Sequence, residues 1–344
     1  MKEHLFLLSR DCLSLARAEV ERSLETKGFL KKNKLIISVN DSSVNDSSVN
    51  DSSNNHLSIV DLSNLSLGYT REVSEILFSE KELKLLLGAK NYDWGSLIKN
   101  SYSIEFEKGI FDEETKKVFF KIVWDSLNKL KKPVVDLKKA DTKIKLYSDG
   151  EKIFVTKNLW TNSEKFEERK AHNRLYNHPT ALHPKLARAM INLAGSSSKI
   201  KKIADPFCGS GGILIEGALM NKKMIGIDID KVQIIRAKEN LKSLNLKSEV
   251  SLGDALDFCE EVDAIISDLP YGKNSKVNNI DNTLRNFFNK ITTCTKILVI
   301  GSEEKMNLPR LIGFEWVIVE EFSIYIHKTM TKKIFVLELV NKNN

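Results

Sequence analysis

The feature that most constrains this chain is a regular alternation of short apolar strands and helices in its second half. The expected strands are residues 202–204, 224–227, 249–252 and 263–267. The acids that follow these strands are Asp205, Asp228, Asp254 and Asp268. Strand–helix alternation predicts a parallel sheet, and the carboxyl ends of parallel strands meet at one edge of such a sheet. We therefore expect the four acids to surround one crevice.

The first of these strands runs into a glycine-rich turn, which is followed by a helix from Ile213. The turn reads Asp205-Pro206-Phe207-Cys208-Gly209-Ser210-Gly211-Gly212. Glycines between a strand and a helix let a ligand approach the backbone closely. A dinucleotide fingerprint would need a third glycine at Leu214, and a P-loop would need Lys-Ser or Lys-Thr after the glycines. The sequence has neither, and the turn instead fits S-adenosylmethionine, with a purely structural turn as the alternative.

The acids after the next strands extend this hypothesis. Asp228 lies 23 residues beyond Asp205, where an acid can accept hydrogen bonds from ribose hydroxyls, and Asp230 is expected to cap the following helix. Asp254 could accept from the adenine amino group or serve only as a turn residue. The predicted cofactor-binding set in this region is Asp205, Pro206, Phe207, Cys208, Gly209, Gly211, Gly212, Asp228, Asp254 and Ala255.

The fourth strand ends in Asp268-Leu269-Pro270-Tyr271-Gly272, and these residue types suit the binding of a nucleobase amine. The exocyclic amine of a nucleobase is a poor nucleophile because its lone pair is delocalised into the ring. The Asp268 carboxylate and the Leu269 carbonyl can hold both N–H groups and direct the lone pair at a methyl donor. Pro270 stiffens the turn and Tyr271 offers a face for stacking on the base. A simple β-turn is the alternative.

The positive charge of the chain is concentrated in one stretch of the sequence. The chain has 344 residues, 42% hydrophobic and 29% charged, which is ordinary for a globular protein of two or three domains. The net charge is +7, yet residues 116–202 alone hold 21 basic and 8 acidic side chains. Such concentrated positive charge favours a polyanionic partner over the alternative of a solvated lysine-rich surface.

Other features exclude several classes of protein. The four cysteines are far apart and no histidine stands at zinc spacing, so we expect neither disulfides nor a metal site. No apolar run of signal-peptide or membrane-spanning length is present, so we expect a soluble, cytoplasmic protein. A five-residue unit, Val-Asn-Asp-Ser-Ser, occurs three times from Val39 to Ser53, and residues 39–55 are expected to form a disordered loop.

The first half shows a different order of elements. Strands are expected at 4–9, 35–39, 57–60, 102–106, 134–137, 143–147 and 152–156. Helices are expected at 12–27, across a mostly helical stretch from 70 to 87, and after a capping Asp112. The opening β-α-β-β-α order suits a small ferredoxin-like unit.

The motifs together resemble a known family. The glycine-rich turn and the Asp268 motif are similar to those of class I RNA methyltransferases that modify the exocyclic amine of guanine. The segment from Asn177 to Arg188, with Asn192-Leu193 after it, resembles the motif before the cofactor turn in archaeal tRNA guanine-N2 methyltransferases. Residues 101–106 and 134–138 resemble their THUMP domain, and residues 327–332 loosely resemble their C-terminus. The family usually has two prolines after the acid, where this chain has Leu269 and Pro270.

The resemblance implies an α/β protein with a C-terminal Rossmann-like class I methyltransferase domain, preceded by an α+β module. The implied boundaries are a ferredoxin-like domain at 1–66, a THUMP RNA-binding domain at 67–157, a linker at 158–177 and the methyltransferase domain at 178–344. The implied cofactor is S-adenosylmethionine, with Thr180 joining the set that binds it. The implied RNA-binding lysines are Lys116, Lys117, Lys121, Lys131, Lys132, Lys138 and Lys139.

The implied activity is methylation of guanosine N2 in tRNA, at guanosine 10, once or twice. Its catalytic residues are Asp268, Leu269, Pro270 and Tyr271. Guanosine 6 of tRNA and ribosomal RNA are alternative substrates, and a partner-dependent RNA-binding module is an alternative class. We expect a monomer that binds tRNA and no membrane, with a small activator subunit left open.

Overall fold

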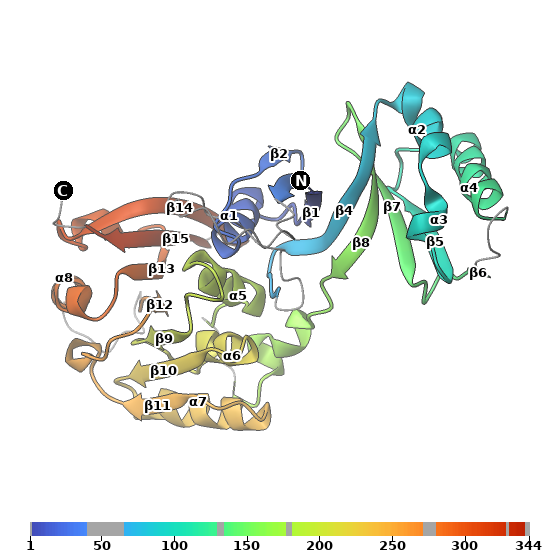
Figure 1. The fold of residues 1–344 in the computed structure, drawn as a ribbon. Helices are drawn as coiled ribbons and strands as arrows, with labels where there is room; N and C mark the ends of the chain where they lie inside the picture. The colour runs from blue at the N-terminus through green and yellow to red at the C-terminus, as the bar shows by residue number, and fades with distance from the viewer. Residues whose placement is uncertain are drawn as a thin grey trace, which may run out of the picture. The chain divides into compact units, whose positions relative to one another are not determined.

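The computed structural model describes residues 2–39, 65–128, 134–176, 181–270, 280–327 and 330–340. Contacts divide the chain into two compact units (Figure 1). The first unit comprises residues 1–10, 27–65 and 70–162, and the second comprises residues 11–26, 66–69 and 163–344. Most of the predicted repeat loop and the predicted strand at 57–60 lie outside the described residues.

The first unit is built on one mixed sheet with the strand order β2-β3-β1-β4-β8-β7-β5-β6. Its strands are β1 (Lys2–Leu8), β2 (Phe29–Lys31), β3 (Lys34–Val39), β4 (Thr70–Glu80), β5 (Ser101–Phe106), β6 (Val134–Val135), β7 (Thr142–Ser148) and β8 (Ile153–Thr161). Its helices are η2 (Glu82–Lys84), α2 (Leu85–Asn91), α3 (Trp94–Leu97) and α4 (Glu113–Asn128). β5 pairs in parallel with β6 and β7, and the other neighbours are antiparallel.

A buried cluster joins the helices of this unit to its sheet. Trp94 of α3 is fully buried against Phe119 of α4, and its indole N–H donates to the Ala89 carbonyl at 2.7 Å. Helix α4 packs on the sheet through one apolar stripe, whose buried residues are Phe119, Val123 and Leu127. Asp112 also caps this helix, with Oδ1 accepting from Thr115 N at 2.6 Å.

The predicted helical stretch at 70–87 is wrong over most of its length. Residues 70–80 form β4, which pairs with β1 on one side and with β8 on the other. Two neighbouring strands satisfy its backbone groups, and Val73, Ile76 and Phe78 suit a strand, so the tertiary pairing outweighs the helix-forming glutamates. A short 3-10 helix, η2, follows at Glu82, and an α-helix begins only at Leu85.

The two compact units run across the predicted domain boundaries. β1, β3 and β4 share a sheet with β8, which continues to Thr161, past the predicted end of the THUMP domain at residue 157. Helix α1 (Leu13–Ser23) belongs to the second unit. The division of the first half into ferredoxin-like and THUMP domains stays a prediction.

The second unit has the sheet order β11-β10-β9-β12-β13-β15-β14. Its strands are β9 (Lys202–Asp205), β10 (Lys223–Asp228), β11 (Glu249–Leu252), β12 (Ala264–Asp268), β13 (Ile297–Glu303), β14 (Trp316–His327) and β15 (Met330–Leu339). The neighbouring strands β11, β10, β9, β12 and β13 run parallel to one another, as the strand–helix alternation predicted. β15 lies antiparallel between β13 and β14.

Helices cover both faces of this sheet. Side chains alternate between the two faces along each strand, so each strand packs against helices on both sides. The α-helices are α1, α5 (Pro184–Leu193), α6 (Gly212–Leu219), α7 (Lys231–Ser243) and α8 (Ile280–Lys290). The shorter ones are η3 (Phe166–Arg169), η4 (Ala171–Asn173), η5 (Ala255–Asp257), η7 (Ile291–Thr293) and η8 (Leu308–Arg310). Ile225 of β10 faces the cluster around α8, whereas its neighbours Met224 and Gly226 contact α6.

Helix α1 is held to α5 by buried polar contacts. The Glu19 carboxylate accepts from Gly68 N at 2.5 Å, from Tyr69 N at 2.8 Å and from Asn192 Nδ2 at 2.8 Å. Burial raises the pKa of Glu19, and these three donors oppose that rise. In the described part of the chain, no helix combines the length and the apolar character needed to cross a membrane.

Candidate functional site

The strand order of the second unit places a cavity where such sheets bind ligands. The chain order reverses between the adjacent strands β9 and β12, because β9 continues outward to β10 while β12 continues outward to β13. Crevices beyond the carboxyl ends of the strands at such a switch point are the usual ligand sites of open α/β sheets. A cavity of about 490 Å³ lies at these strand ends.

Most of the predicted site residues line this one cavity. They are Asp205, Pro206, Phe207, Cys208, Gly209, Gly212, Asp228, Asp254, Ala255, Asp268, Leu269 and Pro270. Four separate strand ends are therefore brought together, as the sequence predicted. Thr180 and Tyr271 lie outside the described residues, although Ala181 and Leu182, next to Thr180, line the cavity.

Gly211 does not line the cavity and has a different use. Its φ is +87°, in the left-handed region, and it is the N-cap of α6. A Cβ at this position would lie 3.2 Å from the Cβ of Ala237 on α7. Gly211 therefore lets the chain turn sharply into α6 and lets α7 pack closely.

Gly209 is the glycine whose missing side chain opens the cavity. Its φ is +50°, and a Cβ built there would have no neighbour within 4 Å. Its N–H donates to Asp228 Oδ2 at 2.8 Å, so the turn after β9 is tied to the end of β10. This open, backbone-lined cradle beside a carboxylate fits a cofactor that carries a ribose and a sulfonium.

Asp205 is a buried carboxylate at the end of β9. Its Oδ1 accepts from Ser267 Oγ at 2.6 Å and from Phe207 N at 3.2 Å. Burial, with smaller contributions from the neighbouring Asp228 and Asp268, raises the pKa of Asp205 to about 7, although the hydrogen bonds from Ser267 and Phe207 oppose the rise. A cation bound beside it would favour its ionised form.

Asp228 and Asp230 hold different backbone groups, and the assignment of Asp228 to a ribose stays a prediction. Asp228 Oδ1 accepts from Asp230 N at 2.8 Å, while Oδ2 holds Gly209. A carboxylate has about four acceptor positions, so Asp228 can still accept from a ribose. Asp230 caps α7, with Oδ1 accepting from Val232 N at 2.9 Å. The prediction that Asp230 is a cap is confirmed.

Asp254 and Ala255 lie at the end of β11. Asp254 is the N-cap of η5, because its Oδ1 accepts from Leu256 N at 2.9 Å. The residue is thus a turn residue that also lines the cavity. Its predicted contact with adenine stays a prediction.

Cys208 and Phe207 complete the wall of the cavity from the turn. Burial raises the pKa of the Cys208 thiol well above its usual value, so the thiol stays protonated and packs as a small apolar group. The Phe207 ring packs edge-on against Phe287 of α8, with ring centroids 5.0 Å apart. This contact anchors the turn to the core.

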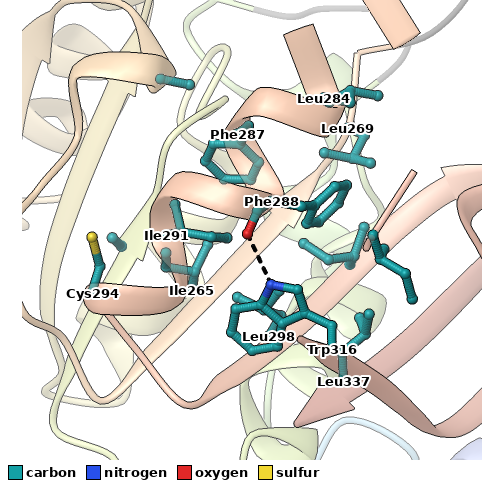
Figure 2. Packing of buried hydrophobic residues seen from close by; sticks show 14 of the residues in the cluster. Ile265, Leu269, Leu284, Phe287, Phe288, Ile291, Cys294, Leu298, Trp316 and Leu337 are labelled. Atoms are coloured by element: carbon teal, nitrogen blue, oxygen red, sulfur yellow. Dashed lines mark hydrogen bonds between the residues drawn. The ribbon is translucent and has the colours of Figure 1, made fainter. Parts of the chain in front are cut away.

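The Asp268 turn is anchored by the side chain that follows the acid. Leu269 is 1% exposed and packs in the cluster with Leu284 and Phe288 of α8 (Figure 2). Trp316 closes this cluster, its indole N–H donating to the Phe288 carbonyl at 2.9 Å. Leu269 N donates to the Gly301 carbonyl at 2.8 Å. Leucine therefore holds this position by burial where the family usually has a proline.

The predicted RNA-binding lysines lie in the first unit. Lys117 and Lys121 are exposed on α4, and Lys116 pairs with Glu113 at 2.6 Å. Lys138 and Lys139 are exposed in the turn after β6, where both backbone N–H groups donate to Asp136 Oδ1 at 2.9 Å. Lys131 and Lys132 lie outside the described residues.

Sequence reasoning missed residues that the structure adds. Lys332 pairs with Asp268, and Ser267 holds Asp205. Trp124 is 45% exposed and follows Lys117 and Lys121 at helical spacing on α4. That spacing is visible in the sequence, and an aromatic residue among lysines is typical of a surface for nucleic acid. Lys332 ends the segment 327–332 that loosely resembles the family, but no local signal pairs it with Asp268.

Comparison with known proteins identifies the class. A family model described as "RMKL-like, methyltransferase domain" matches residues 171–332, and a DNA methylase model matches residues 20–239. The fold is similar to that of TrmN from Thermus thermophilus, with a TM-score of 0.52 and 17% identity over 98% of this chain and 100% of that one. The chain is an enzyme of the S-adenosylmethionine-dependent methyltransferase class, with a Rossmann-like catalytic fold.

Curated relatives identify the family. The chain is 31% identical over 285 residues to tRNA (guanine(10)-N2)-dimethyltransferase of Methanothermobacter thermautotrophicus, covering 80% of this chain and 84% of the relative. It is 26% identical over 215 residues to tRNA (guanine(6)-N2)-methyltransferase of Methanocaldococcus jannaschii, covering 48% of this chain and 56% of the relative. The chain belongs to the family of tRNA (guanine(10)-N2)-dimethyltransferases.

Proposed function

We propose that this protein methylates the exocyclic N2 of guanosine 10 in tRNA, giving N2-methylguanosine and N2,N2-dimethylguanosine. The observation that carries the proposal is that the Asp268 turn and the glycine-rich turn line the same cavity. A nucleobase amine held by the first turn would therefore meet a methyl donor held by the second. Family membership supports the choice of guanosine 10.

The chemistry follows from the groups in the cavity. S-adenosylmethionine supplies a methyl group on a positively charged sulfur. The Asp268 carboxylate and the Leu269 carbonyl accept the two N–H groups of guanine N2, which directs its lone pair at that methyl carbon. With the cofactor bound, transfer of this methyl group to N2 would leave the C–S electron pair on sulfur, and N2 would release one proton to water. S-adenosylhomocysteine is the second product.

Each protein group has a part in holding the reactants. Asp205, beside the turn, would face the cationic amino-acid end of the cofactor, and Asp228 would accept from its ribose. Tyr271 is proposed to stack on the base, and Thr180 to complete the cofactor site. We assign tRNA binding to the lysines of the first unit together with Trp124, as a THUMP-containing module.

The test is a methyl-transfer assay with position mapping. Unmodified tRNA transcripts are incubated with the protein and tritiated S-adenosylmethionine, and the products are digested and mapped by mass spectrometry. We expect methylated N2 at guanosine 10, and a transcript with adenosine at position 10 serves as the matched control. Transfer to that control transcript at the same rate would contradict the proposed position.

A second candidate is guanosine 6 of tRNA, favoured by the similarity to the guanosine-6 enzyme. The same mapping separates the two positions. A partner-dependent RNA-binding module is a third candidate, and its mark would be failure of the purified chain to bind labelled S-adenosylmethionine. All four strand-end acids line the cavity, which supports an enzyme that binds its cofactor alone.

A further inference from the structure

Lys332 and Asp268 form a buried ion pair at the cavity. Lys332 lies on β15, and its Nζ is 2.5 Å from Asp268 Oδ1 and 2.6 Å from Oδ2. The Lys332 side chain is 4% exposed and that of Asp268 is 16% exposed. Burying a lysine is costly unless a partner compensates its charge, so the pair is a built part of the site.

Three neighbouring strands make this contact possible. Asp268 on β12 pairs with Gly301 on β13, and Lys332 on β15 pairs with Glu303 on β13. The lysine therefore reaches the carboxylate across β13. A Cβ at Gly301 would lie 2.7 Å from Asp268 Oδ1. Only glycine at this position leaves room for the carboxylate where the lysine holds it.

The charges that face Asp268 come from the strands on both sides. Lys332 comes from β15, Glu303 from β13 and Asp205 from β9. Burial raises the pKa of Asp268, Glu303 raises it further, and Lys332 lowers it. Without Lys332, the carboxylates of Glu303 and Asp205 would still face Asp268, and their negative charge would favour its protonated form.

We propose that Lys332 is a positioning residue for methyl transfer, which holds both oxygens of Asp268 and keeps the carboxylate facing the cavity as an anion. The inference rests on the proposed function and adds to it the residue that fixes the acceptor of the guanine amine. A carboxylate held by an ammonium group accepts a hydrogen bond well but takes up a proton poorly. The proton released by N2 would then pass to water rather than to Asp268.

The experiment compares three variants at one strand. Lys332→Met removes the charge, Lys332→Arg keeps it, and Lys333→Met is the matched control. Lys333 is the next residue on β15 and pairs instead with Glu321 at 2.5 Å. Rates of methyl transfer to tRNA are measured from about pH 6 to about pH 9, together with the dissociation constant of S-adenosylmethionine. The Asp268 carboxyl carbon is titrated by NMR in protein labelled with ¹³C-aspartate, with Asp268→Asn giving the assignment.

We expect Lys332→Met to lower kcat at neutral pH by about 100-fold, the low end of the effect of removing one preorganised charge or donor. The acidic limb of its pH profile should move to higher pH, and the Asp268 carboxyl should titrate at higher pH than in the wild type, because the cation that lowers its pKa is gone. Lys332→Arg should recover most of the lost rate. Lys333→Met should stay within about twofold of the wild type, since that side chain lies away from the pair.

Three results would overturn the inference. These are an unchanged pH profile in Lys332→Met, an Asp268 carboxyl that titrates alike in wild type and variant, or equal losses in the Arg and Met variants. Should Lys332→Met not fold, Lys332→Gln gives the same readouts, because it keeps an N–H donor without the charge. A wild type that methylates no guanosine would end the proposed function, while the carboxyl titration would still decide on the ion pair.

Discussion

The cavity of the second unit and the lysine surface of the first unit are built on opposite principles. In the cavity, each acid is partly or fully buried and has backbone or side-chain partners, as Asp228 has Gly209 and Asp205 has Ser267. On α4, Lys117 and Lys121 are exposed. Lys121 pairs with Asp125, four residues further along the same helix, at 3.0 Å. Exposed pairs of this kind contribute little to stability.

This difference separates two ways of holding a substrate. Buried groups with fixed partners lose little entropy when a ligand arrives, so each one has a large and specific effect on chemistry. Exposed lysines act together through long-range attraction, and each contributes a small share of affinity that salt reduces. Substitutions in the two regions should therefore differ in size, in additivity and in the step they affect.

The largest effect is expected at Asp268. Asp268→Ala should lower kcat by about 10³-fold, because the amine loses its charged acceptor and Lys332 loses its partner. The affinity for tRNA should stay within about twofold, since phosphate contacts dominate it. Single-turnover transfer and filter binding measure the two quantities. If Asp268→Ala lowered kcat and tRNA affinity to the same extent, the cavity and the lysine surface would not act on separate steps.

The next effect is expected on cofactor affinity. Asp228→Ala removes a charged acceptor from the ribose and from Gly209, so binding of S-adenosylmethionine should weaken by about 10- to 100-fold. Asp230→Ala is the comparison variant, because Asp230 also lines the cavity but its carboxylate caps α7, and losing the cap should cost about 1 kcal/mol of stability while the Asp228 carboxylate stays in place. Calorimetric titration gives the dissociation constants, and thermal unfolding gives the stabilities. Equal weakening in both variants would contradict the assignment.

A smaller effect should appear with pH. The pKa of Asp205 is raised to about 7 by burial, so its ionised fraction grows as pH rises through that value. Affinity for the cationic cofactor should increase by about tenfold between about pH 6 and about pH 8, following this fraction. For the stability of the free protein the sign is opposite, because the contribution of Asp205 to the free energy of unfolding is fully present below the ordinary pKa of 3.8 and is lost as pH rises through about 7. Asp205→Asn should flatten the pH dependence of cofactor affinity and that of stability, measured by calorimetric titration and thermal unfolding. If either dependence kept its slope in the variant, Asp205 would not be the titrating group.

The smallest effect per residue is expected on the lysine surface. The double variant Lys117→Ala/Lys121→Ala should weaken tRNA binding by a few-fold, with kcat unchanged at saturating tRNA. Each lost phosphate contact should reduce the log–log salt slope by about 0.7–0.9. Lys81→Ala/Lys84→Ala is the control, with the same charge change at another exposed site of the first unit. Identical slopes in the two double variants would make α4 an ordinary solvated surface.

Local signals in the sequence predicted much of the site. Strand–helix alternation indicated the parallel strands, and an aspartate at each strand end indicated where a cavity would form. The caps at Asp112 and Asp230 were also predicted, because a cap involves residues only two or three positions apart. All these features depend on groups that are close in the chain.

Other features depended on pairing between distant segments. Residues 70–80 are a strand because β1 and β8 pair with them, although their composition favoured a helix. Lys332 reaches Asp268, 64 residues away, because β15 lies beside β13 and Gly301 leaves space between them. By itself the sequence determined the strand-end acids and their order, since hydrogen bonding and periodicity act over a few residues. Only the tertiary structure decided which charge stands against which, because strand order in a sheet is set by packing across the whole unit.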